Sequence, residues 1–106
     1  MTKNQYCQFW LTCADSEEAA KISHALLEKR LVACVKGVLV SSSYHWRGDI
    51  EQSEEVLLVM ESILDRFDDV EKLVSTMHSY DTFVLQAVPI LKLSKEAQKW
   101  LEGEVA

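Results

Sequence analysis

The chain has 106 residues, of which 48% are hydrophobic and 26% charged, with three glycines and one proline. This composition is typical of one globular domain, so we expect residues 1–106 to form a single domain without a linker. The formal net charge is −6, from 17 acidic and 11 basic residues, and the basic residues form no cluster. This argues against nucleic acid or an anionic membrane as the main partner.

The cellular location is predicted from the N-terminal region and the cysteines. The apolar run around residues 6–13 is too short and too interrupted for a signal peptide, and nothing approaches a transmembrane span. The three cysteines, Cys7, Cys13 and Cys34, are an odd number without CxxC spacing, which argues against a disulfide framework. We therefore expect a cytoplasmic protein.

Residues Tyr6 to Cys13 are predicted to form a first strand, because apolar and polar side chains alternate along them. Asp15 then fits a helix N-cap, with Glu18 three residues later in the capping-box position. This helix is predicted to run to about Arg30, with Lys29 and Arg30 in a last turn where the helix dipole favours positive charge. Its buried stripe comprises the apolar residues at helical spacing, Ala19, Ile22, Ala25 and Leu26.

Residues 33–62 predict a long β-hairpin with a tight turn at Arg47-Gly48-Asp49. Gly48 favours the turn, because it takes a positive φ without a Cβ clash. The two strands would reach roughly 35–40 Å at ~3.4 Å per residue, which is longer than a small domain needs. We therefore expect the hairpin to project beyond the monomer and to contact a partner.

A second helix is predicted after the hairpin, with Asp65 as its N-cap and an end around residues 78–80. Its buried stripe comprises Phe67, Val70, Leu73, Val74 and Met77. Thr82 to Leu91 are predicted to form a fourth strand, and Pro89 places the end of this strand at a sheet edge or bulge. A last helix, from Ser94 to about Glu104, is expected to pack Trp100 and Leu101 on the body.

The order β-α-β-β-α-β plus a terminal helix predicts the α+β class and the ferredoxin-like split β-α-β layout. In this layout a four-stranded antiparallel sheet carries its helices on one face. The third and fourth predicted strands are apolar on both sides, so the other face would expose an apolar patch. This predicts an oligomer assembled sheet to sheet.

Three segments resemble the CutA family of divalent-cation tolerance proteins: TCADSEEAAKISHALLEKRLVACV (12–35), SYHWRGDIEQSEEVLLVMES (43–62) and HSYDTFVLQAVPI (78–90). Trp100 corresponds to the tryptophan of the family's closing helix. The resemblance implies a ferredoxin-like fold, similar to that of the nitrogen-signalling PII proteins, and a homotrimer in which the hairpin strands pair between subunits. It also implies a role in tolerance to divalent metals, with copper bound by some members and no established enzymatic reaction.

The chain departs from the family pattern where function would lie. Ser79 replaces the proline of the usual His-Pro-Tyr, Val84 replaces an acidic residue, Glu61 a lysine and Ala97 a tyrosine. Copper-binding members can carry a cysteine at the position of Thr12 and a histidine at that of Met77; here the cysteine, Cys13, comes one place later. The sequence therefore leaves open whether the family's metal site is altered or absent.

The candidate metal ligands are His78, Met77 and Cys13. His78 matches the family's cleft histidine, and neutral imidazole suits copper and zinc; alternatively it is a helix C-terminal histidine favoured by the dipole. Met77 offers a soft thioether but also fits the buried stripe. Cys13 would supply a thiolate if the helix N-terminus lowers the pKa of its thiol, or it is a small buried hydrophobe.

The other chemistry-bearing residues are interpreted as structural or solvated. Cys7 and Cys34 are predicted to lie in the core, His24 in solvent, and His45 beside Trp46. The last group consists of four acidic residues at the start of the third predicted strand, Asp49, Glu51, Glu54 and Glu55. These residues either concentrate divalent cations at a subunit junction or form a solvated surface.

No glycine-rich phosphate loop, HExxH or GxSxG motif is present, so we expect neither an enzyme nor an organic cofactor. We predict a protein that binds a divalent metal ion, copper in particular, in divalent-cation tolerance. The alternative is a PII-like regulatory trimer that binds a small ligand or partner protein in the intersubunit cleft. A third reading is a trimeric scaffold without a specific ligand.

Overall fold

The computed structural model describes residues 5–105, which contain four strands, three α-helices and one 3-10 turn. In chain order these are β1 (Tyr6–Cys13), α1 (Ser16–Glu28), β2 (Cys34–Trp46), β3 (Asp49–Ile63), the 3-10 turn η1 (Leu64–Arg66), α2 (Phe67–Met77), β4 (Leu85–Pro89) and α3 (Lys95–Glu104). None of the described helices is long and apolar enough to cross a membrane.

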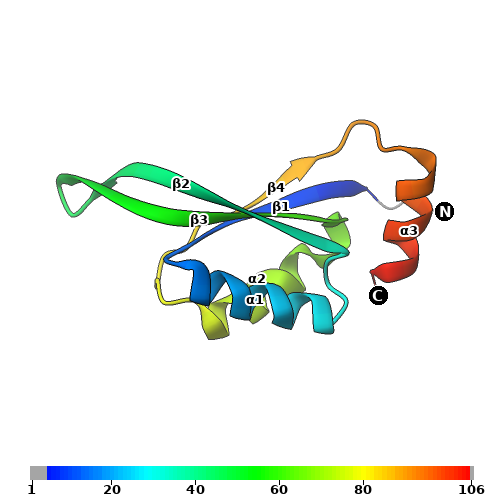
Figure 1. Cartoon of the computed structure of the whole chain (residues 1–106), viewed down its shortest axis with the longest axis horizontal. Helices are drawn as coiled ribbons and strands as arrows, with labels where there is room; N and C mark the ends of the chain where they lie inside the picture. Colours follow the sequence, from blue (N-terminus) through cyan, green and yellow to red (C-terminus); the bar gives the residue numbers. More distant parts are fainter. Residues whose placement is uncertain (1–4, 106) are drawn as a thin grey trace.

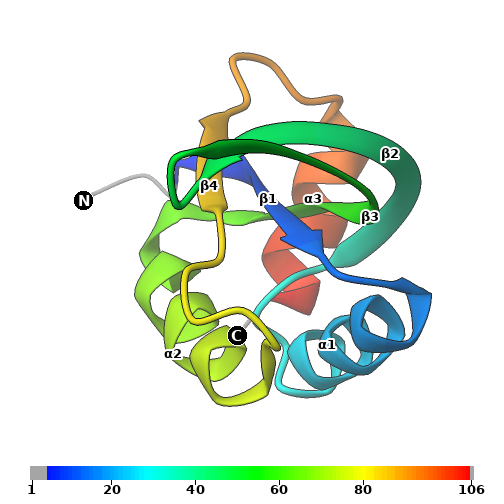
Figure 2. The ribbon, with the colours of Figure 1, turned by 90° about the vertical axis from the view of Figure 1, so that its left-hand side faces the viewer.

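The strands form one antiparallel sheet in the order β2-β3-β1-β4. Strand β1 therefore lies inside the sheet, whereas β2 and β4 are its edges. Helices α1 and α2 lie side by side under one face, and α3 packs at the end of the sheet away from the hairpin tip (Figure 1 and Figure 2). This is the α+β, ferredoxin-like arrangement that the element order predicts.

The core lies between the sheet and the two helices. The alternation in β1 turns Cys7, Phe9, Leu11 and Cys13 towards the helices, and all four are buried. The facing side of the helices consists of Ala19, Ile22, Leu26, Val70 and Val74. The Phe9 ring meets that of Phe67 edge-on, with 5.7 Å between centroids. These contacts confirm the predicted buried stripes and fix how α1 and α2 sit under the sheet.

Strands β2 and β3 form the predicted hairpin, paired in register from Cys34–Glu61 to Trp46–Asp49. Arg47 (φ 51°) and Gly48 (φ 87°) both have positive φ, as in the two-residue turns whose twist matches a hairpin. Asp49, predicted as part of the turn, is the first residue of β3. The hairpin extends beyond the helices (Figure 1), and the molecule is 48 Å long.

Helix α1 ends at Glu28, two residues earlier than predicted. Arg30 adopts a left-handed backbone conformation (φ 58°). The N–H groups of Arg30 and Leu31 each donate a hydrogen bond of 3.0 Å to a carbonyl group of the last helical turn. Because the chain turns here, Lys29 and Arg30 lie beyond the last turn. The prediction that they sit inside it is wrong.

Helix α3 is attached to the end of the sheet through a second, smaller apolar cluster and through Arg30. Leu101 is fully buried and belongs to the same cluster as Ile63. The Arg30 guanidinium donates to the carbonyl groups of Gly103 (2.7 Å) and Glu104 (3.0 Å). These are among the last carbonyls of α3, so a side chain from the end of α1 caps the C-terminus of α3.

Two predictions about the helices are wrong, namely that Asp65 is the N-cap of α2 and that Trp100 packs on the body. Asp65 lies within η1, and α2 begins at Phe67 without a side-chain cap, because the chain leaves β3 through a 3-10 turn. Trp100 is 44% exposed, although the adjacent Leu101 is buried. Neighbouring helical residues point roughly 100° apart, so only one of the two can face the body.

Strand β4 is shorter than the predicted segment of residues 82–91. Phe83 lies outside the strand, and its ring stacks on that of His78 with 5.3 Å between centroids. Pro89 is the last residue of β4, which is an edge strand, so its predicted placement is confirmed.

The sheet face turned away from α1 and α2 carries both polar and apolar side chains. Glu61 is buried there and accepts hydrogen bonds from Gln8 Nε2 (3.0 Å) and Lys36 Nζ (3.3 Å). Trp10 Nε1 extends this network by donating to Gln8 Oε1 at 3.0 Å. Val38, on the same face, is 50% exposed. No helix within residues 5–105 covers this face (Figure 1), and the predicted oligomer across it stays a prediction.

Candidate metal site

Cys13, Glu18 and His78 form a compact cluster where three segments meet. Cys13 ends β1, Glu18 lies in the first turn of α1, and His78 follows the last residue of α2. One donor atom from each side chain lies within 4.8 Å of the other two. The fold therefore brings two of the predicted ligands, His78 and Cys13, together with a carboxylate that the sequence assigned only to helix capping.

The His78 ring is fully buried and uses both of its nitrogens. Nδ1 accepts a hydrogen bond from the N–H of Tyr80 (3.0 Å), and Nε2 lies 2.8 Å from the carbonyl oxygen of Thr12. These partners assign the neutral tautomer, with the proton on Nε2 donated to Thr12. The only imidazole lone pair that a metal ion would need is thus engaged by the backbone of Tyr80.

Glu18 joins the start of α1 to the segment after α2. Its N–H donates to the Asp15 carboxylate (2.8 Å), as the predicted cap requires. Its own carboxylate accepts hydrogen bonds from the N–H of Ala14 (2.8 Å) and the N–H of Ser79 (2.6 Å), and lies 3.8 Å from His78. Partial burial raises the pKa of Glu18, but these hydrogen bonds outweigh it, so the pKa lies below its usual value.

Cys13 is a protonated thiol in this environment. Burial raises the pKa of Cys13 to about 12, and the nearby carboxylates of Glu18, Asp15 and Glu55 act in the same direction. The expectation that the helix N-terminus lowers this pKa is therefore wrong, because burial and like-charged neighbours dominate.

Met77 packs against the core cluster beneath the sheet, as its spacing on α2 predicts. Among the other cysteines, Cys7 is buried as expected, whereas Cys34 is only half-buried. His24 is exposed and pairs with Glu28 at 3.1 Å, in agreement with its predicted solvation. His45 lies exposed near the hairpin tip.

The acidic stretch of β3 is not uniformly solvated. Asp49, Glu51 and Glu54 are exposed, but Glu55 is only 6% exposed and accepts a hydrogen bond from the Tyr80 hydroxyl at 2.8 Å. Tyr80 thereby connects β3 to the segment that carries His78. Sequence spacing could not predict the hydrogen bond between Tyr80 and Glu55, since 25 residues separate them in the chain.

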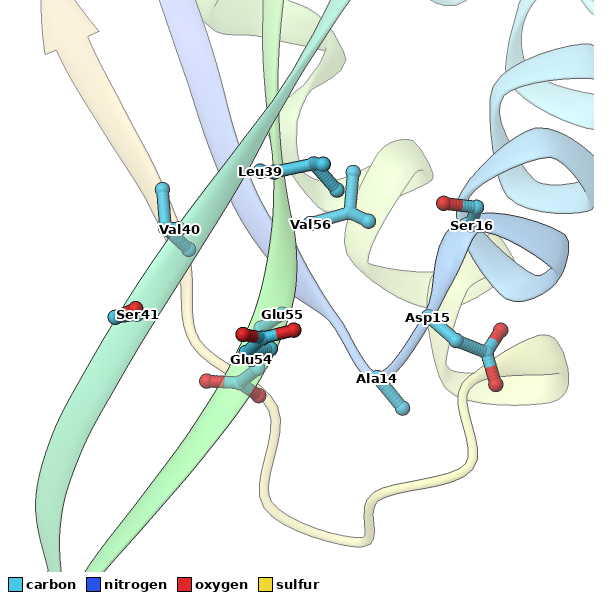
Figure 3. Close-up of a pocket in the computed structure, with 9 residues that line it drawn as sticks. All are labelled: Ala14, Asp15, Ser16, Leu39, Val40, Ser41, Glu54, Glu55 and Val56. Carbon is cyan, nitrogen blue, oxygen red and sulfur yellow. The ribbon is translucent and has the colours of Figure 1, made fainter.

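A shallow groove of about 320 Å³ lies beside the cluster, between the start of α1 and the hairpin. Glu54 and Glu55 line it from β3 and Asp15 from the start of α1, with Leu39 and Val56 as apolar neighbours (Figure 3). The Asp15 carboxylate points away from the two glutamates (Figure 3). The three carboxylates that line the groove therefore do not point towards a common position.

The cluster has the donor types of a soft or borderline metal site, namely thiol, imidazole and carboxylate. In the conformation described, however, each donor is already committed. The imidazole lone pair and the carboxylate oxygens accept backbone hydrogen bonds, and the thiol keeps its proton. A cation that uses the His78 lone pair would have to displace the N–H of Tyr80.

Comparison with known proteins gives a consistent result. The family model of the CutA1 divalent ion tolerance protein matches residues 7–104. The divalent-cation tolerance protein CutA of Archaeoglobus fulgidus is 35% identical over 96 residues, which cover 91% of this chain and 94% of that protein. The corresponding protein of Thermus thermophilus is 33% identical over 92 residues, covering 86% and 89%.

Solved structures show the same fold. The structure of the periplasmic divalent cation tolerance protein CutA from Archaeoglobus fulgidus has a TM-score of 0.93 at 34% identity, covering 95% of this chain and 99% of that one. CutA1 from the psychrotrophic bacterium Shewanella sp. SIB1, described as a stable protein, has a TM-score of 0.91 at 31% identity, with 98% of each chain covered. The chain belongs to the CutA1 family of divalent ion tolerance proteins.

Proposed function

We propose that the protein binds divalent cations, copper in particular, and acts in divalent-cation tolerance. The observation that carries this proposal is the cluster of Cys13, Glu18 and His78, whose donor atoms lie within 4.8 Å of one another. Membership of a family named for divalent ion tolerance supports it. The proposal assigns no catalytic activity to the chain.

The bound cation would be held by a ring nitrogen of His78, a Glu18 oxygen and the sulfur of Cys13. Imidazole and sulfur favour copper over magnesium or calcium, which prefer oxygen ligands. Binding would have to replace the hydrogen bonds from Ser79 and Tyr80 and remove the thiol proton. We therefore expect modest affinity, suited to buffering a cation rather than to storing it permanently.

We further propose that the protein works as a homotrimer in the cytoplasm. The uncovered sheet face and the projecting hairpin support an assembly of identical chains, because Val38 is exposed on that face and Leu39 and Ile50 are exposed along the hairpin. The cysteine pattern supports the cytoplasm. The relative from Archaeoglobus fulgidus is described as periplasmic, so cell fractionation is the direct test of location.

The function is tested by calorimetric titration of the metal-free protein with Cu²⁺ in a weakly coordinating buffer, with redox-inert Zn²⁺ as a comparison. His78→Gln removes the imidazole but keeps an amide that can donate towards Thr12, so the variant should fold. The matched control is His24→Gln, which removes an exposed histidine from α1. We expect saturable binding that weakens at least tenfold, about 1.4 kcal/mol, in His78→Gln and is unchanged in the control.

Equal binding by the wild type and His78→Gln, or loss of binding in both variants alike, contradicts the assignment of the site. That result would favour the PII-like regulatory alternative. One observation supports the alternative: the cluster is closed by hydrogen bonds, while the groove beside it is open to a small ligand or a peptide.

A further inference from the structure

The segment His78–Tyr80 lies across the donor atoms of the cluster. The Ser79 N–H donates to Glu18 Oε1 at 2.6 Å, and the Tyr80 N–H donates to His78 Nδ1 at 3.0 Å. Both acceptors belong to side chains that the proposed cation would use, and Nδ1 is the His78 nitrogen that carries the lone pair. The segment and the cation therefore compete for the same two side chains.

The segment is fastened at its far end by the Tyr80 side chain. The hydroxyl donates to Glu55 Oε2 at 2.8 Å, and Glu55 is a buried carboxylate on β3. Burial and the adjacent Glu55 raise the pKa of Tyr80, so the hydroxyl remains a donor at neutral pH. A hydrogen bond from a hydroxyl to a carboxylate is of the strong, charge-assisted kind.

The chain on the other side of Tyr80 is irregular as far as the start of β4 at Leu85. Residues 81 and 82 are exposed, and the ring of Phe83 stacks on His78. The backbone of residues 79–82 is held by no helix or sheet hydrogen bonds, so the Tyr80 hydroxyl is its attachment to the sheet. Such a segment can open without unfolding α2 or β4.

We infer that the hydrogen bond between Tyr80 and Glu55 is a latch that holds residues 78–80 over the cluster and controls access of a cation to His78 and Glu18. This inference rests on the proposed function. Tyr80 and Glu55 are positioning residues, since neither supplies a ligand atom. Opening the latch frees the His78 lone pair and a Glu18 oxygen together.

The latch makes a quantitative prediction. If only the open state binds the cation, the apparent dissociation constant equals the intrinsic one divided by the open fraction. The same open fraction governs hydrogen exchange of the amides of Ser79 and Tyr80. A change that weakens the latch must therefore accelerate exchange and tighten cation binding by the same factor.

The test uses Tyr80→Phe, which removes the hydroxyl and keeps the ring against His78. The control is Tyr44→Phe, which removes a hydroxyl that contacts Ser53 at 3.3 Å on the hairpin. Exchange of the Ser79 and Tyr80 amides is measured by NMR in the metal-free protein, and Zn²⁺ affinity by calorimetry. In Tyr80→Phe we expect both to rise by about tenfold, with exchange in α1 unchanged and no effect in the control.

Tyr80→Phe leaves the buried Glu55 carboxylate without the Tyr80 hydroxyl, which could disturb folding. A second variant therefore tests the latch independently. Glu55→Gln keeps an acceptor for the hydroxyl but removes the charge, so we expect smaller increases of the same two quantities. Unchanged exchange in Tyr80→Phe overturns the latch. Faster exchange with unchanged Zn²⁺ affinity shows that the latch does not control access of the cation. Absence of Zn²⁺ binding in the wild type and in all variants overturns the proposed function together with the latch.

Discussion

Glu18 is the residue that joins the most parts of the site. The sequence places it in a capping box, in which its carboxylate would accept a hydrogen bond from the backbone N–H of the N-cap residue, Asp15. In the structure the carboxylate instead accepts from Ala14 and, across the fold, from Ser79. Both partners are backbone donors, so the ionised carboxylate is the form that satisfies them.

Glu18→Gln should lower stability in a pH-dependent way. The amide offers one oxygen and one NH₂ group, so it cannot accept both backbone hydrogen bonds. The pKa of Glu18 is lowered in the folded state, so its stabilisation is present above the ordinary carboxyl pKa and is lost as the pH falls through the folded-state pKa. We expect a loss of about 1.5–3 kcal/mol at pH 7, measured by urea unfolding, that shrinks towards pH 3.

The control for this experiment is Glu17→Gln, because the Glu17 side chain is 79% exposed and pairs only with Lys21 on the same helix. It should change stability by less than about 0.5 kcal/mol at either pH. A loss in Glu18→Gln that stays the same at pH 7 and pH 3 would show that packing, rather than the charge, explains the effect.

The site could be predicted only in part. His78 and Cys13 were identifiable because their residue types and their places beside helix ends are visible in the sequence. The protonation state of Cys13 was not identifiable, because its pKa depends on burial and on three carboxylates, two at the start of α1 and one on β3. Tyr80 and Glu55 escaped prediction because their contact depends on tertiary packing that spacing does not encode.

At the scale of elements, the attachment of α3 depends on a residue outside it. Arg30 sits in the left-handed region, which glycine usually fills at a helix end. Its guanidinium caps the carbonyls of Gly103 and Glu104. The arginine thus accepts backbone strain at the end of α1 and stabilises the end of α3.

Comparing Arg30→Ala with Arg30→Gly separates these two effects. Both variants lose the hydrogen bonds to α3, but only the glycine relieves the left-handed strain. We expect faster amide exchange at the end of α3 in both, and Arg30→Gly to be more stable than Arg30→Ala by about 1 kcal/mol in urea unfolding.

Lys29→Ala serves as the control, since Lys29 is exposed and adjacent but donates nothing to α3 in the described contacts. It should leave α3 exchange unchanged. If Arg30→Ala also leaves it unchanged, the apolar contacts of Leu101 alone hold the helix.

At the scale of the whole molecule, no helix within residues 5–105 covers one sheet face or much of the hairpin (Figure 1). An exposed apolar residue on a monomer can be replaced by lysine with little effect on stability, within about 0.5 kcal/mol. The same replacement inside an interface between copies buries a charge and weakens assembly. A single substitution to lysine on the uncovered face can therefore test whether this face lies in an interface between copies.

For the proposed trimer, Val38→Lys is therefore expected to shift the protein towards monomer in analytical ultracentrifugation, and to lower the Tm at equal protein concentration. Leu64→Lys is the control, because Leu64 is 42% exposed but lies in η1, outside the sheet. The trimer is contradicted if the wild type sediments as a monomer or if its Tm does not rise with protein concentration.

The fold was more predictable than its details. Period-two alternation defined β1 to the residue, and the polar turn at Arg47 and Gly48 defined the hairpin, because both signals are local. The fourth strand was overestimated, since Phe83 has a strand-forming side chain that a tertiary contact with His78 removes from the sheet. Local propensity cannot register such a competition.

The strand order also dictates the sequence of events during synthesis. Strands β2 and β3 are neighbours in the chain, so the hairpin can form within microseconds once both have been made. Strand β1 needs β3 on one side and β4 on the other, and both contacts close long loops. Strand β1 thus remains incompletely paired until β4 has been made, and its apolar face stays exposed in the nascent chain until then, where a chaperone can bind it.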